Sequence, residues 1–407
     1  QWHSKGVYQI PYRCYVTPDL DNLFVGGRII SSSHVANGTT RVMCTSALGG
    51  EVIGRAASIC LSKGYKPIDL VDRDRIGLLQ SLLVKNGNFI PGIAVAVEDN
   101  LADSAELSVS SVLELDDLPA DGTWFGLDYP IAQLIPVNGR APVVRMNVKA
   151  DNATRLVMEL RSSSKSENYT PDTIDAVLEF DLKKDENEIV ADFSYSYATP
   201  RYAFICLMKN PEISVPMSGR LVTGLTAVYN YINPAVSNFG KQVPPEGIGV
   251  EEFEFWCPKR RPESKNIAMS FAPPLASFNS ENLRNSYYRP YIGTNAWVAA
   301  FDDARPEVCF KWNGRKQIKT IILYFDTDTD QAMETVQMGH FDACVPTCYR
   351  EYIIRNSEGK ELYHITGNHQ TLNVLELDQP VTTDAIYVNF VRPCGDVCPG
   401  LMGVYVC

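Results

Sequence analysis

The spacing of the apolar positions changes along this chain near residue 92. Before that point, apolar and small residues recur at helical spacing, first over residues 42–63 and again within residues 67–92. Beyond it, apolar and polar residues alternate with a period of two, in short runs separated by turn residues. The pattern predicts a small α/β N-terminal part followed by a larger, mainly β region.

The approach to the first helix contains a double glycine. An apolar strand is predicted at residues 23–25, and it ends at Gly26 and Gly27, where a ligand can approach the backbone because neither residue has a Cβ. A polar loop follows, with Thr39 or Thr40 as the predicted N-cap. We expect the N–H groups of the helix to point back toward the glycine turn, which suits a phosphate, a carboxylate or an electron-rich ring oxygen.

The β region divides at a stretch rich in proline and glycine. Residues 92–233 are predicted to form a first antiparallel β-sandwich, residues 234–264 a connector and residues 265–407 a second sandwich of the discoidin or jelly-roll kind. Residues 1–91 form the N-terminal part, which begins with an edge strand. The predicted strands include residues 94–97, 143–148, 155–160, 176–180, 202–207, 253–256, 307–312, 320–325, 351–355, 374–377 and 385–391.

The run VYQIPYRCYVTPDLDNLFVGGRIISSSHVANGTTRVMCTSALGGEVIGRAASICLSKG, residues 7–64, carries a resemblance to a known family. It resembles the C-terminal end of the FAD-binding domain in bacterial FAD-dependent oxidoreductases. Near the other end, ENLRNSYYRPYIGTNAWVAAFDDARPEVCFKW and ITGNHQTLNV are similar to the β-rich C-terminal region of some of these enzymes. The resemblance implies a flavoprotein with FAD as its cofactor.

The strand–GxGxxG–helix that binds the ADP half of FAD has no counterpart in this sequence. The nearest strings, LGGEVIG and EGIGVEE, have the wrong spacing or no strand before them. We therefore expect a truncated or split flavin domain. The partner predicted for it is a second chain that carries the N-terminal half of that domain.

Seven site residues follow from the resemblance. The double glycine and the arginine after it are expected beside the ribityl–pyrophosphate, and the start of the helix beside the pyrimidine end of the isoalloxazine. A histidine of the polar loop is the candidate acid or base. An ordinary turn, a salt-bridged arginine and a hydrogen-bonded histidine are the structural alternatives. The residues are Gly26, Gly27, Arg28, Arg41, Val42 and Met43 for FAD, and His34 for catalysis.

Aromatic and amide residues gather ahead of the first clear strand of the second sandwich, whose order of elements resembles discoidin-like carbohydrate-binding sandwiches. Flat rings stack on pyranose faces and amides hydrogen-bond to hydroxyls, so the set predicts a carbohydrate contact. Packing against the end of the sandwich or against the flavin domain is the alternative. The residues are Tyr287, Tyr288, Tyr291, Asn295 and Trp297.

Charge, hydropathy and cysteine spacing limit the kinds of partner and metal site that the sequence suggests. The formal net charge is −11 and the longest basic run is residues 259–261, which argues against a nucleic-acid-binding protein. No apolar run approaches the roughly 20 residues of a membrane span. Two pairs of cysteines are closely spaced, Cys344 with Cys348 and Cys394 with Cys398. Each pair is compatible with buried free thiols, a disulfide or a metal site, and no metal ligand is assigned. The compartment, cytoplasmic or periplasmic, stays open.

These observations lead to function hypotheses of different classes. The first is part of an FAD-dependent oxidoreductase that transfers a hydride between N5 of FAD and a small organic substrate, with sugars as one substrate class. Such a chain would be inactive without the nucleotide-binding half. The alternative is a non-enzymatic β-sandwich module that binds carbohydrate or protein. A third is that the N-terminal residues complete the flavin domain of another polypeptide.

Overall fold

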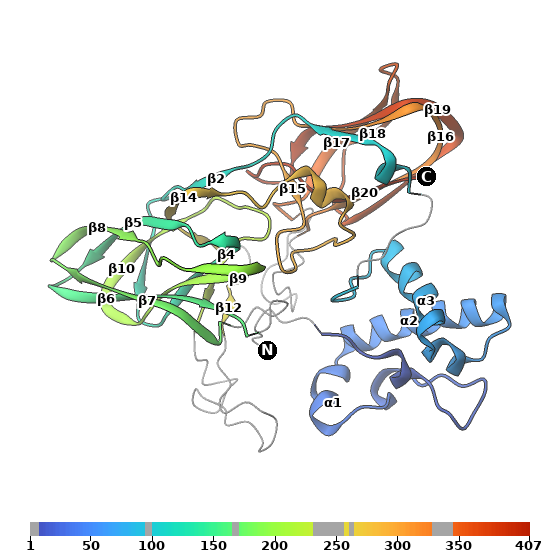
Figure 1. Cartoon of the computed structure of the whole chain (residues 1–407), viewed down its shortest axis with the longest axis horizontal. Coiled ribbons are helices and arrows are strands. Elements are labelled where there is room, and N and C mark those ends of the chain that lie inside the picture. The colour runs from blue at the N-terminus through green and yellow to red at the C-terminus, as the bar shows by residue number, and fades with distance from the viewer. Residues whose placement is uncertain (1–7, 94–99, 165–170, 231–255, 260–263, 328–344) are drawn as a thin grey trace. The chain divides into compact units, whose positions relative to one another are not determined.

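The computed structural model of the chain describes residues 8–93, 100–164, 171–230, 256–259, 264–327 and 345–407 (Figure 1). The chain forms two compact units. One is Tyr8–Asp99, called here the N-terminal unit, and the other, called the β unit, contains Asn100–Cys407. The three α-helices of the described residues lie in the N-terminal unit, and none of them is both long and apolar enough to cross a membrane.

Local sequence signals account for one end of each of two helices in the N-terminal unit, the C-terminus of α2 and the N-terminus of α3. α2 stops at Gly64, whose left-handed conformation (φ 68°) lets its N–H bond to the carbonyl of Cys60. α3 starts after Asp72, whose carboxylate accepts from the N–H of Asp74 at 2.9 Å. Buried side chains of both helices, among them Ala56 and Leu79, form the core of the unit. The elements are η1 (Tyr12–Tyr15), η2 (Gly27–Ile29), α1 (His34–Thr40), α2 (Met43–Lys63), η3 (Pro67–Val71) and α3 (Arg73–Lys85).

Strand predictions for this unit are wrong. Residues 23–25 contribute only an isolated bridge, between Phe24 and Val16. The predicted edge strand near the start of the unit is instead η1, which follows Pro11. A two-stranded ladder without further partners is only marginally stable, so helix packing determines the conformation of these segments.

The mainly β fold class is confirmed in the rest of the chain, where every strand pairing is antiparallel. Two sheets form the first sandwich, and the side chain of Gln133 joins them: its amide donates to Asn266 and accepts from the N–H of Ile267. One sheet has the order β12-β11-β4-β9-β6-β7, and the other has β13-β10-β5-β14-β2, with β3 on β10 and β8 on β5. Their strands are β2 (Leu115–Leu118), β3 (Trp124–Leu127), β4 (Ile131–Arg140), β5 (Val143–Ala150), β6 (Thr154–Ser162), β7 (Thr173–Leu182), β8 (Asp185–Ala191), β9 (Ser196–Leu207), β10 (Asn210–Ser218), β11 (Thr226–Tyr229), β12 (Cys257–Pro258), β13 (Asn266–Ile267) and β14 (Met269–Leu275).

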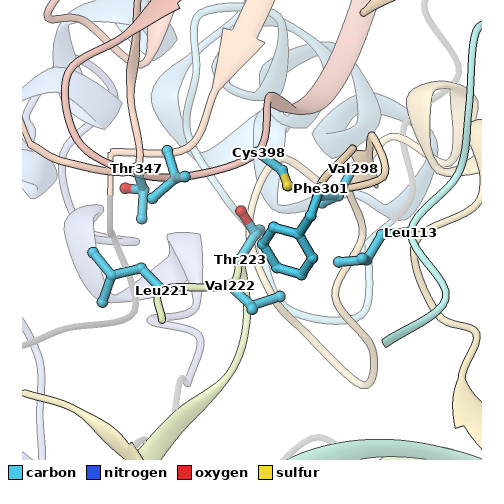
Figure 2. Close-up of a pocket in the computed structure, with 9 residues that line it drawn as sticks. Leu113, Leu221, Val222, Thr223, Val298, Phe301, Thr347 and Cys398 are labelled. Carbon is cyan, nitrogen blue, oxygen red and sulfur yellow. The ribbon is translucent and has the colours of Figure 1, made fainter. Parts of the chain in front are cut away.

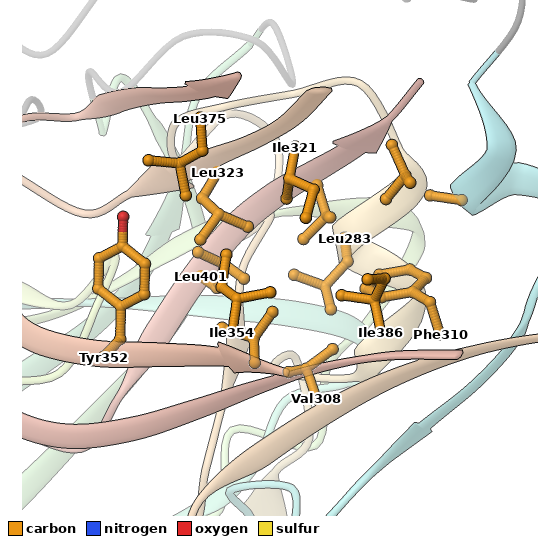
Figure 3. Packing of buried hydrophobic residues seen from close by; sticks show 14 of the residues in the cluster. Leu283, Val308, Phe310, Ile321, Leu323, Tyr352, Ile354, Leu375, Ile386 and Leu401 are labelled. Atoms are coloured by element: carbon orange, nitrogen blue, oxygen red, sulfur yellow. The ribbon is translucent and has the colours of Figure 1, made fainter. Parts of the chain in front are cut away.

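The C-terminal sheet has the order β15-β20-β16-β19-β17-β18, with β1 on β16. Figure 3 shows its core, in which Phe310 and Ile354 are fully buried. Residues 307–312 and 320–325, predicted as two strands, belong to one long strand with register shifts around Gly314 (φ +100°). The strands are β1 (Glu106–Val109), β15 (Trp297–Val298), β16 (Glu307–Phe325), β17 (Tyr349–Asn356), β18 (Glu361–Ile365), β19 (Leu372–Pro393) and β20 (Gly400–Val406), and the short helices are η4 (Leu101–Ser104) and η5 (Ser280–Arg284).

Strand pairing crosses the domain ranges that we predicted from the sequence. β1 lies within the range of the first sandwich but pairs with β16 of the C-terminal sheet. β14 lies within the range of the second sandwich but pairs with β5 and β2 of the first. The chain therefore passes twice between the two sandwiches. The predicted strand at residues 94–97 and most of the predicted connector lie outside the described residues.

The two sandwiches of the β unit contact one another through the loop between β10 and β11 (Figure 2). Thr223 in this loop donates from its hydroxyl to the buried carboxylate of Asp326 at 2.7 Å. The guanidinium of Arg220 lies 4.1 Å from the ring centroid of Phe301. The remaining space is about 10 Å³, room for one water.

Thr223→Val is expected to lower the free energy of unfolding of the β unit by about 1–3 kcal/mol, because valine has no hydroxyl and the buried carboxylate of Asp326 loses a hydrogen-bond donor. Urea denaturation would measure the change. Thr173→Val is the control, since that threonine is exposed, and we expect a change below about 0.5 kcal/mol. Equal stability of Thr223→Val and the wild type would contradict the expected role of this hydrogen bond.

Candidate functional site

The double glycine adopts the turn geometry that its sequence predicts. Gly26 is extended (φ −138°, ψ 166°), and Gly27 has a φ of +66°, a conformation that favours glycine. A Cβ on Gly26 would lie 2.9 Å from Cδ1 of Ile53 in α2. The missing side chain at Gly26 thus allows close packing against a helix. Arg28, the next candidate, is exposed.

The first turn of α2 has no side-chain cap. Val42 is the N-cap residue, extended, and its side chain cannot accept a hydrogen bond from the helix. The N–H groups of the first turn are therefore available to an electron-rich group, at the positive end of the helix dipole. Arg41 and Met43 flank this end, and both are exposed, Met43 to 87%. These three candidates lie together.

The structure does not bring the double glycine to the start of α2. Gly26 packs at Ile53, ten residues along the helix from Met43, which corresponds to about 15 Å at 1.5 Å per residue. The predicted cradle of a glycine turn beneath the helix N-terminus is therefore wrong in its geometry. The two groups of candidates are separate features of the unit.

The segment before α2 is a short helix, where the sequence predicted a polar loop. His34 is the first residue of α1 and is exposed; its N-cap is Ser33, whose hydroxyl accepts from the N–H of Ala36 at 3.3 Å. The predicted N-caps of α2, Thr39 and Thr40, are instead the last residues of α1. Among the described residues, no hydrogen-bond partner orients His34, so its role as acid or base stays a prediction.

The aromatic and amide set in the β unit is mostly buried. Trp297 is fully buried and donates from Nε1 to the carbonyl of Ser111 at 2.8 Å. Tyr288 is stacked on Tyr324 with 3.7 Å between ring centroids, and its hydroxyl donates to Tyr405.

The amide of Asn295 donates to the carbonyls of Arg289 and Tyr291. Tyr291 is buried and Tyr287 is half-buried. These residues therefore pack within the protein, which was the alternative to a carbohydrate contact. Tyr288, Asn295 and Trp297 cannot present ring faces or amide groups to a sugar without unfolding the region around them.

The two cysteine pairs singled out in the sequence, Cys344 with Cys348 and Cys394 with Cys398, do not form disulfides within each pair. Cys348 and Cys398 are free thiols, while Cys394 is disulfide-bonded. Burial raises the pKa of Cys348 and of Cys398 to about 12, so both are protonated at neutral pH and are poor metal ligands and nucleophiles. Cys344 lies outside the described residues. Over the part of the chain that the structure describes, no group of three or more His, Cys, Asp or Glu side chains could hold a metal ion.

A hollow between α2 and α3 is the feature that the sequence analysis missed. Its volume is about 540 Å³, and the walls come from both helices and from the segments on either side of them. The signal was present in the spacing of Cys44, Leu48 and Val52, which lie four residues apart on one face of α2. That spacing shows which face is apolar, and the fold determines whether a neighbour fills it.

Comparison with known families bears on this unit. Residues 1–83 match the family described as FAD dependent oxidoreductase. The match covers 83 of 407 residues. Nothing among the curated proteins matches the chain.

Solved structures similar to this chain include two carbohydrate-binding modules. The family 32 module from Streptococcus pneumoniae EndoD has 11% identity and a TM-score of 0.25, and the match covers 32% of this chain and 86% of that one. The family 32 module of C. perfringens NanJ, in complex with galactose, has 12% identity and a TM-score of 0.22, and the match covers 33% and 83%. Likeness at this level carries no conclusion about fold or ligand.

The described residues fit one end of FAD and not the other. The uncapped first turn of α2, next to Arg41, is suited to the electron-rich edge of the ring. The ADP half needs a strand followed by a glycine-rich turn at a helix N-terminus. The described part of the N-terminal unit has no strand, and its glycine turn lies against the middle of α2. Among the described residues of the unit, the turn expected for the ADP half is therefore not found.

Proposed function

We propose that the N-terminal unit is the ring-facing part of an FAD-dependent oxidoreductase domain, completed by a polypeptide segment that carries strand–GxGxxG–helix. The family match over residues 1–83 is the observation that carries the proposal. The uncapped start of α2 supports it, because Arg41, Val42 and Met43 lie there together. The completed domain would transfer a hydride between FAD and a small organic substrate.

The exposed apolar side chains of this unit are consistent with a surface that the completing segment covers. Among the described residues, eleven of the 19 large apolar side chains that are exposed belong to it, although it is less than a quarter of the chain. Another protein layer would bury such side chains wherever they adjoin one another. The eleven are Tyr8, Leu20, Leu23, Ile29, Val35, Val42, Met43, Leu48, Leu61, Val71 and Leu78.

The proposal predicts that the chain alone retains no FAD, whereas the chain joined to the completing segment does. An absorbance spectrum after excess FAD is removed would show a flavin band near ~450 nm only for the completed protein, because the ADP half needs its own phosphate-binding turn. In the completed protein, Arg41→Ala should weaken FAD retention and Arg55→Ala should not, since Arg55 pairs with Glu51 farther along α2. Equal loss in both variants would contradict a role for the start of α2.

Carbohydrate binding by the β unit stays a prediction. Tyr288, Asn295 and Trp297 serve packing, so a sugar site would need other residues. Titration with galactose, monitored by calorimetry, is the direct measurement.

A further inference from the structure

The hollow of the N-terminal unit is bounded by four segments of the chain. One face of α2 supplies Cys44, Leu48 and Val52, and one face of α3 supplies Ile76 and Leu79. The residues just before and within η1 form the third wall, and the residues that follow α3 form the fourth. Its volume of about 540 Å³ lies within the range of small-molecule sites.

Tyr15 packs directly on α2 at one edge of the hollow, against Gly49. A Cβ on Gly49 would lie 2.9 Å from Cε1 and 3.1 Å from the hydroxyl of Tyr15, so the helix presents no side chain there. Leu48, the residue before it, is 54% exposed at the rim. Neither position fills the space between the two helices. Tyr15 and Gly49 thus form one part of the wall, and the hollow lies beyond them between the two helices.

The lining combines aromatic and aliphatic side chains, which form its larger part, with several polar ones. Tyr8, Tyr12, Tyr15 and Phe89 contribute rings. The hydroxyl of Tyr12 is occupied, because it donates to the carbonyl of Pro67 at 2.9 Å, and burial raises its pKa, so it carries no charge. Flat apolar walls favour a flat ligand, which stacks on rings and loses little hydration.

The polar side chains of the lining favour a ligand with a negative charge. Arg13 is the one charged side chain among the described residues that line the hollow, and within the described chain it forms no ion pair. Gln80 also lines the hollow, and no described residue hydrogen-bonds to its amide. No carboxylate lines the described walls, so a cationic ligand would find no counter-charge. A carboxylate would find a guanidinium and an amide donor.

We propose that this hollow binds a small aromatic carboxylate, with its rings between α2 and α3 and its carboxylate toward Arg13 and Gln80. A sugar fits less well, because the aromatic and aliphatic side chains that form the larger part of the lining would leave some of its hydroxyls without partners. The inference does not depend on flavin, since every wall belongs to the N-terminal unit.

Equilibrium dialysis of the full chain, without FAD, with 1-naphthoate as the probe tests the proposal. We expect saturable binding of 1-naphthoate, and weaker binding of galactose and of 1-naphthylmethylammonium. Leu48→Glu should reduce naphthoate affinity at least tenfold, because it places a like charge at the rim. Leu61→Glu is the matched control: Leu61 is 87% exposed on the same helix, outside the hollow, and its substitution should leave binding unchanged.

Arg13→Gln provides a second, milder variant. It should weaken naphthoate about three- to tenfold, the loss expected for one partly exposed charged hydrogen bond, and leave neutral naphthalene unaffected. No saturable naphthoate binding, or equal losses in Leu48→Glu and Leu61→Glu, would overturn the proposal. It would also be overturned by a wild-type chain that self-associates, binds no naphthoate and becomes monomeric with Leu48→Glu, because the hollow would then be a contact between copies.

Discussion

Trp297→Ala is expected to lower the free energy of unfolding of the β unit by about 3–5 kcal/mol, the cost of truncating a buried aromatic residue. Trp297 is fully buried in the core of the C-terminal sheet, 5.5 Å from the ring of Phe390. The truncation also leaves the carbonyl of Ser111 without its indole donor. Urea denaturation followed by far-UV circular dichroism would measure the loss.

Two further tryptophan variants separate packing from ligand contact. Trp297→Phe keeps most of the ring, so its loss should fall between those of the wild type and the alanine variant. Trp124→Ala is the control, because Trp124 is 38% exposed and its ring contacts the ammonium of Lys149 as a cation–π partner. We expect it to lower the free energy of unfolding by about 1 kcal/mol or less. A Trp297→Ala protein with wild-type stability and reduced affinity for galactose would contradict the packing role and restore the carbohydrate prediction.

Gly403→Ala is expected to cost about 3 kcal/mol, at the upper end of ordinary overpacking. A Cβ at this position would lie 2.6 Å from Cε1 and 2.7 Å from Cδ1 of Tyr288. The tyrosine cannot move away, because it is stacked on Tyr324 and hydrogen-bonded to Tyr405. Thermal unfolding and the near-UV signal of the tyrosines would report the change.

A double-variant cycle tests the cause of that loss. Tyr288→Leu combined with Gly403→Ala should lose less than the sum of the two single variants, because removing the ring also removes the clash. Gly367→Ala is the control, since nothing lies within 4 Å of a Cβ there and the residue is exposed. Additive losses in the cycle would mean that Tyr288 is not the neighbour that excludes a side chain at Gly403.

Local signals predicted the two longer helices, α2 and α3, missed α1 and predicted N-terminal strands that do not form. α2 and α3 end and begin at residues with a local reason, a left-handed glycine after Lys63 and a capping aspartate at Asp72. A strand needs a partner, and residues 23–25 have only a bridge to Val16. Pairing depends on distant segments, which a run of three apolar residues does not identify.

The candidate site shows the same limit. Family resemblance selected the residues around the start of α2 as candidates, and residues 1–83 match the family by comparison, but the role of these residues stays a prediction. The residue types of Gly26 and Gly27 allowed two readings, close approach to a ligand and close approach to protein. Only the position of Ile53 shows that the protein itself approaches Gly26.

The sequence by itself determined that the chain is mainly β beyond a helical start, because the period of the apolar positions reports the local backbone conformation. It also determined the C-terminal end of α2 at Gly64 and the start of α3 at Asp72, which depend on neighbours within a few residues. The tertiary structure alone decided that β1 and β14 cross between the sandwiches, that Trp297 packs into the core, and that a hollow lies between α2 and α3. Each of these depends on contacts between segments far apart in the chain, which periodicity does not encode.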